Sequence, residues 1–260
     1  MKNFKKYFLI SLLLSCVFII SACAKSSDSD KKQERKLTTP EILNKTINNI
    51  NNLNSYETFT AGNGYSVLKD SPSTNATDYT IETSLIKEPL AYKLIDKSPA
   101  LTSEYYYLAG AEYIRKSTPE ISPDWESKAD TTKTASYFQD TFHFRSIINY
   151  NKDFSLTESD NTYIVEFRPQ NLDEFKNTYY SSASPSVKDK SKLEIYSSKV
   201  SIDKNTFLPI SEEIEYKKIE YSDDSEIYSN IHRKEKREYK NFNSVETFKL
   251  PIEKENVKAD

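Results

Sequence analysis

Val200–Ile210 reads Val-Ser-Ile-Asp-Lys-Asn-Thr-Phe-Leu-Pro-Ile, a strand that enters a polar turn and then returns. The turn, Asp203-Lys204-Asn205-Thr206, joins two long predicted strands, Lys192–Asp203 and Phe207–Tyr221. Alternating apolar and polar residues continue along both arms, as expected for a sheet with one wet face. This hairpin therefore predicts that an antiparallel sheet forms the centre of the protein.

Further strands are predicted on both sides of the hairpin. The clearest is Thr162–Arg168, in which Tyr163, Val165 and Phe167 alternate with the other residues. Gly62-Asn63-Gly64 is a turn signal that we expect to interrupt the first strand region. The 117–130 segment around Trp125 is expected to be a loop. The remaining predicted strand regions are Ser55–Leu68, Asp78–Lys87, Ala91–Asp96, Tyr105–Leu108, Tyr113–Lys116 and Glu226–Tyr239.

One helix is predicted before the first strand, and two more are predicted between later strands. Thr39 is a suitable N-cap, Pro40 suits the first helical position, and apolar residues recur at helical spacing from Ile42 to Leu53. Thr134–Tyr150 and Asn171–Tyr180 are two further predicted helices, the second with Asn171 as its cap. Strands that outnumber helices in one continuous region indicate a single α+β domain.

The N-terminus has the features of a secretion signal. Lys2, Lys5 and Lys6 precede the apolar segment Phe8–Ile20, which is short for a permanent membrane span. Ile20-Ser21-Ala22-Cys23 follows, and this order resembles the bacterial lipobox. The resemblance implies cleavage before Cys23 and a diacylglycerol on its thiol, an anchor that holds a protein firmly to a membrane. The alternative is an ordinary secretory peptide with an incidental cysteine.

Predicted domain boundaries follow from this leader. Residues 1–22 are the signal peptide, 23–38 are the lipidated cysteine and a polar, disordered linker, and 39–260 are one domain. The protein is expected on the outer face of the bacterial cell membrane. Its composition, rich in Lys, Asn, Ile and Tyr, is typical of a Gram-positive bacterium with an AT-rich genome.

Composition excludes several classes of function. The chain has a formal net charge of −3, and loss of the leader would remove three lysines and no acidic residue. An acidic domain is a poor partner for nucleic acid. Only Cys16 and Cys23 are present, so the processed and lipidated chain would hold no disulfide and no cysteine nucleophile.

Three motifs together resemble the lipoprotein-carrier (LolA-like) superfamily and the small Gram-positive lipoproteins grouped near it. They are the Asp203–Pro209 hairpin, the helix exit Leu53-Asn54-Ser55-Tyr56, and the close from Tyr239-Lys240-Asn241-Phe242 to Leu250-Pro251. The resemblance implies a strongly curved antiparallel sheet, a half barrel, with helices on its concave face. It also implies an apolar cavity that holds acyl chains in carrier members.

No catalytic or metal-binding signature is present. His143 and His232 lie far apart and belong to no zinc motif, and the chain has neither a nucleophile elbow nor a phosphate loop. We therefore predict a protein that is not an enzyme and needs no cofactor or metal. His143 is expected to pack beside its aromatic neighbours and His232 to be solvated.

Two hypotheses about function remain open. In the first, an apolar cavity lined by Tyr163, Val165, Phe167, Ile214 and Tyr216 binds or senses a lipid or another hydrophobic ligand. The same alternation would also arise if these residues simply formed the core. In the second hypothesis the protein is an interaction module without a cavity, and its polar, tyrosine-rich surface contacts an envelope protein or a wall polymer. We expect a monomer that is tethered through Cys23.

Overall fold

The computed structural model describes residues 35–68, 77–129, 147–148, 150, 152–179, 190–221, 227–250 and 257–259. The chain forms two compact units, Met1–Leu37 and Thr38–Asp260, and all described helices and strands belong to the second. The predicted secretion signal, the predicted lipidation site Cys23 and His143 lie outside the described residues. Within the described ranges, no helix is both long and apolar enough to cross a membrane.

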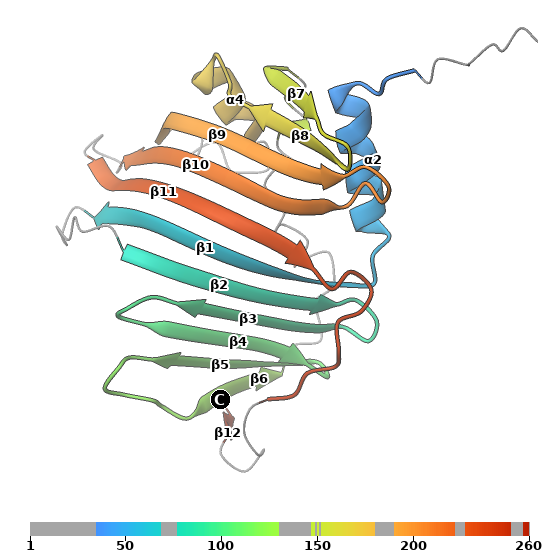
Figure 1. Cartoon of the computed structure of the whole chain (residues 1–260). Coiled ribbons are helices and arrows are strands. Elements are labelled where there is room, and N and C mark those ends of the chain that lie inside the picture. Colours follow the sequence, from blue (N-terminus) through green and yellow to red (C-terminus); the bar gives the residue numbers. More distant parts are fainter. Residues whose placement is uncertain are drawn as a thin grey trace, which may run out of the picture. The chain divides into compact units, whose positions relative to one another are not determined.

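The second unit is built on one open sheet in which β1 lies between two antiparallel halves (Figure 1). The strand order is β12-β6-β5-β4-β3-β2-β1-β11-β10-β9-β8-β7, and only the β12–β6 pair is parallel. The fold class expected from the sequence, an α+β protein with a curved half-barrel sheet, is confirmed. The strands are β1 (Ser55–Leu68), β2 (Thr77–Ile86), β3 (Ala91–Lys97), β4 (Thr102–Leu108), β5 (Ala111–Ser117), β6 (Trp125–Ala129), β7 (Phe154–Glu158), β8 (Thr162–Phe167), β9 (Ser191–Asp203), β10 (Pro209–Tyr221), β11 (Ile227–Lys240) and β12 (Val257–Ala259).

Two helices are described in full, α2 (Thr39–Asn51) and α4 (Leu172–Tyr179). The cap of α2 is Thr38 rather than the predicted Thr39, because the Glu41 carboxylate accepts bonds from both the Thr38 amide and its hydroxyl. The predicted Asn171 cap of α4 is confirmed, since its side-chain oxygen accepts the Glu174 amide at 3.0 Å. Most of the helix predicted over Thr134–Tyr150 lies outside the described residues.

One part of the hydrophobic core lies where α4 covers β8 and β9. Phe175 of α4 is fully buried, and its ring centroid lies 5.0 Å from Phe167 and 4.6 Å from Tyr196. Tyr150 meets both phenylalanines edge-on, and Phe154 of β7 lies against Phe167. We call the face of the sheet that carries these side chains the inner face and these five residues the aromatic cluster.

Two predictions about local structure are wrong. Gly62-Asn63-Gly64 does not turn; it continues β1 in register with β2 on one side and β11 on the other. The expected loop at 117–130 contains β6, which begins at the fully buried Trp125 and pairs with β5. A five-residue strand carries too short an alternation to be recognised before its pairing partner is known.

Candidate functional site

The predicted cavity residues share the inner face but lie in different surroundings. Val165 and Phe167 are buried, and Phe167 belongs to the aromatic cluster, where its neighbours fill the space around it. Tyr163 stacks on Phe207 of the β9–β10 turn. Ile214 and Tyr216 of β10 lie further along the sheet, opposite Glu235 and Arg233 of β11 respectively. The inner face of the sheet therefore has two parts, one packed with aromatic rings and one that carries charged side chains.

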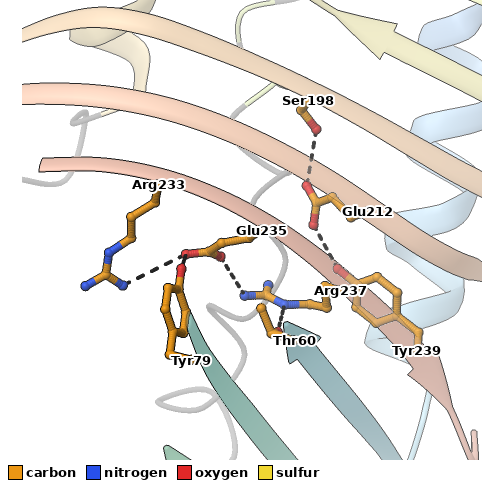
Figure 2. Close-up of polar contacts among 8 residues, drawn as sticks. All are labelled: Thr60, Tyr79, Ser198, Glu212, Arg233, Glu235, Arg237 and Tyr239. Atoms are coloured by element: carbon orange, nitrogen blue, oxygen red, sulfur yellow. Dashed lines mark hydrogen bonds and ion pairs between the residues drawn. The ribbon is translucent and has the colours of Figure 1, made fainter. Parts of the chain in front are cut away.

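The charged part is a group of eight residues that we call the polar cluster, shown in Figure 2. Its members come from β1, β2, β9, β10 and β11, and the register of the sheet places them on neighbouring positions of the inner face. They are Thr60, Tyr79, Ser198, Glu212, Arg233, Glu235, Arg237 and Tyr239.

Glu235 is the centre of one half of the polar cluster. Its carboxylate accepts the Tyr79 hydroxyl at 2.6 Å and lies 3.9 Å from both Arg233 and Arg237. Arg233 also lies over the Tyr79 ring, 5.1 Å from its centroid. Burial and the bond to Glu235 raise the pKa of the Tyr79 hydroxyl well above its usual range. Tyr79 is therefore a permanent hydrogen-bond donor to this carboxylate.

The strand glycines that resemble a turn make room for this half of the polar cluster. A Cβ at Gly62 would lie 2.5 Å from Cζ of Tyr79, and one at Gly64 would lie 2.9 Å from Cγ of Arg233 and 2.5 Å from the backbone oxygen of His232. A glycine inside a strand often marks such a close approach. The two glycines are thus a sequence signal for the polar cluster, although the same Gly-Asn-Gly pattern is also typical of a turn.

Glu212 is the centre of the other half and is 0% exposed. Its two oxygens accept the Tyr239 hydroxyl at 2.8 Å and the Ser198 hydroxyl at 3.3 Å, and Arg237 lies opposite Glu212 in the sheet. Burial raises the pKa of the Glu212 carboxyl to about 7, although Arg237 and the two hydroxyls favour the ionised form. Glu212 can therefore gain or lose a proton near neutral pH.

An apolar hollow of about 620 Å³ lies at the end of the sheet where β2 turns into β3 and β4 turns into β5. We call it the tail pocket, because the chain after β11 forms its third wall. Phe248 meets the Tyr106 ring edge-on at 6.4 Å, and the Asn243 amide donates to the Ser55 carbonyl, so the tail is held against the sheet. Its principal apolar walls are Ile86, Pro89, Leu90, Leu108, Phe248 and Leu250.

A second hollow of about 890 Å³ is polar and crosses seven strands, from the end of β3 to β8. We call it the outer groove. Glu166 and Arg168 line it whereas the intervening Phe167 does not, and side chains alternate between faces along a strand. The outer groove therefore lies on the face opposite to the polar cluster.

No group of three or more His, Cys, Asp or Glu side chains that could hold a metal ion occurs in the described ranges. Nε2 of His232 lies 3.0 Å from Glu215, and its ring meets Tyr65 edge-on, so it takes part in a side-chain pair on the outer face rather than standing alone in solvent.

Comparison with known proteins identifies a family but no activity. Residues 38–258 match a family described as "Family of unknown function (DUF6612)". No curated protein matches the sequence. Among solved structures, lipoprotein LppX of Mycobacterium tuberculosis is similar at 9% identity and a TM-score of 0.37, over 80% of this chain and 96% of that one.

A DUF1329 family protein from Desulfovibrio piger is also similar, at 9% identity and a TM-score of 0.27, over 82% of this chain and 93% of that one. Likenesses this distant say nothing about what this chain binds. The assignment to a Gram-positive group of LolA-like lipoproteins stays a prediction from the sequence.

Proposed function

We propose the following function for this chain, which belongs to the family of unknown function DUF6612: it is a membrane-anchored extracytoplasmic lipoprotein that binds a hydrophobic ligand, such as the acyl part of a lipid. It is not an enzyme. Cys23 carries the lipid anchor, and residues 24–38 tether the binding domain to the outer face of the cell membrane. The tail pocket is the binding site.

The size and walls of the tail pocket carry this proposal. Its volume of about 620 Å³ is within the range of roughly 300–1,000 Å³ that is typical of small-molecule sites. Leu90 and Leu108 are partly exposed, so an apolar ligand that covered them would remove apolar surface from water. Tyr113 also lines the pocket, and its hydroxyl could orient a polar end of the ligand.

The position of the pocket differs from the one expected from the sequence. The predicted cavity residue Phe167 belongs to the aromatic cluster, where rings from α4, β7 and β9 already occupy the space around it, and Val165 of the same strand is buried. The tail pocket instead uses the two turns and the tail, and its walls come from parts of the chain far apart in sequence. Sequence alternation along one strand could not reveal such a site.

A direct test is titration of a fluorescent long-chain fatty acid into the chain that begins at residue 23 and carries Cys23→Ser. We expect saturable binding that weakens about tenfold or more in Leu90→Asp, because a carboxylate in an apolar site costs free energy unless it is paired. Ile121→Asp is the matched control, since Ile121 is 64% exposed and lies outside the pocket. Equal binding by all three proteins would refute the tail pocket as the site.

A further inference from the structure

The outer groove carries opposite charges on adjacent strands. Lys234 and Lys236 of β11 project beside Glu215 and Glu213 of β10, to which they are paired in register. Lys199 of β9 follows beyond Glu213, and Glu166 of β8 follows beyond Lys199. The groove thus presents cationic and anionic positions in alternation rather than a field of one sign.

Some of these charges are satisfied within the protein and some are not. Lys234 lies 3.2 Å from Glu215, and Lys199 lies 3.6 Å from Glu166. In the part of the chain that the structure describes, the side chains of Glu213 and Arg168 line the groove, are exposed, and make no hydrogen bond or ion pair with another side chain. One free carboxylate and one free guanidinium therefore remain for a ligand.

The charge pattern restricts the chemistry of that ligand. A polyanion such as nucleic acid needs a basic surface, which this balanced groove is not. Among the described residues that line the groove, the one aromatic residue is Tyr79, whose ring lies on the inner face over Gly62, so these residues offer no exposed ring as a platform for sugar rings. A ligand that carries both amino and carboxylate groups matches the alternation.

The length of the groove suits an extended chain. Seven strands at a spacing of about 4.8 Å span roughly 29 Å, which is the length of about nine extended residues at about 3.3 Å each. We propose that the outer groove is a second binding site, distinct from the tail pocket, for an extended peptide that bears both amino and carboxylate groups.

The test uses the same Cys23→Ser chain and the nine-residue peptide Lys-Ser-Glu-Ser-Lys-Ser-Glu-Ser-Lys, whose lysines and glutamates share one face when the peptide is extended, and binding is measured by calorimetry at low salt. Binding at peptide concentrations up to about 1 mM is expected, and it should weaken as salt is raised because exposed charges are screened. The double variant Glu213→Gln/Lys236→Gln should weaken binding about tenfold or more. The control Glu126→Gln/Lys128→Gln changes two exposed charges on β6, outside the groove, and should have no effect.

Three outcomes would overturn the proposal. They are no binding of the mixed peptide, equal binding of an uncharged Gly-Ser peptide of the same length, and equal loss in the groove and control variants.

Vesicles of phosphatidylethanolamine provide a further arm, because their headgroup also pairs an amine with an anion. Groove-dependent binding of vesicles without binding of the peptide would assign the groove to the membrane and contradict a peptide site. Fatty-acid binding should be unchanged in the groove variant, which keeps the two sites separable.

Discussion

The aromatic cluster and the polar cluster occupy the same face of one sheet, yet their chemistry is opposite. Under α4, inward positions of β8 and β9 are Phe167 and Tyr196, and rings fill the interior. Two strands further on, inward positions of β11 are Arg233, Glu235 and Arg237, and the interior is held by hydrogen bonds and ion pairs. An inward position on a strand therefore need not be apolar, provided that each buried charge finds partners.

The largest expected effect is in the aromatic cluster. Phe167→Ala should lower the free energy of unfolding by about 4 kcal/mol, because Phe167 is fully buried and its removal leaves a cavity among rigid rings. Urea denaturation measures this change. Ile121→Ala at an exposed site should cost little, and an equally small loss for Phe167→Ala would show that the cluster is not a packed core.

The polar cluster should respond to loss of a charge rather than of volume. Arg237→Met should destabilise the protein by about 3 kcal/mol at pH 8, because Glu212 and Glu235 would remain buried without this cation. The double variant Glu212→Gln/Arg237→Met should recover part of the loss. Denaturation curves that are identical for the two variants would argue against electrostatic coupling between Arg237 and Glu212.

The pH dependence of stability should also separate the two clusters. The carboxyl of Glu212 has a pKa of about 7 in the folded chain, compared with the ordinary value of 4.5 that we take for the unfolded chain. The folded state therefore holds the proton more tightly. Stability from this group is present at low pH and is lost as pH rises through about 7, by about 2.5 kcal/mol between pH 5 and 8. Glu212→Gln should remove this part of the slope, whereas Phe167→Ala should leave it; an unchanged slope in Glu212→Gln would contradict the assignment.

The smallest expected effect concerns Gly62 of β1, whose missing side chain leaves space on the inner face for the Tyr79 ring. Gly62→Ala should cost about 1–2 kcal/mol, since the new methyl would displace the Tyr79 ring and its bond to Glu235. In a Tyr79→Ala background the same substitution should cost clearly less, because the ring is gone. Additive losses in this double-mutant cycle would mean that Gly62 does not make room for Tyr79.

Much of the sheet could be predicted from the sequence because its strands are long and alternate regularly. Thr162–Phe167, the hairpin around Asp203–Thr206 and the strand preceding Lys240 were all recognisable from their own residues. β6 and β7 have five residues each, and their stability comes from pairing that the sequence does not display.

The candidate site was harder to predict than the fold, for a physical reason. The polar cluster depends on register: Tyr79, Gly62 and Glu235 form one row only because three strands are aligned at those residues. The tail pocket depends on how residues 247–250 meet two distant turns. Neither arrangement is visible in the periodicity of a single segment, which for β8 indicates only that Tyr163, Val165 and Phe167 share one face of the sheet.

Native mass spectrometry of the Cys23→Ser chain, purified under mild conditions and followed by solvent extraction, tests the proposed function most directly. We predict a discrete co-purifying mass of lipid size, which Leu90→Asp removes and Ile121→Asp retains. If the Cys23→Ser chain without any further substitution shows only its ligand-free mass and takes up no added fatty acid, ligand binding in the tail pocket is contradicted.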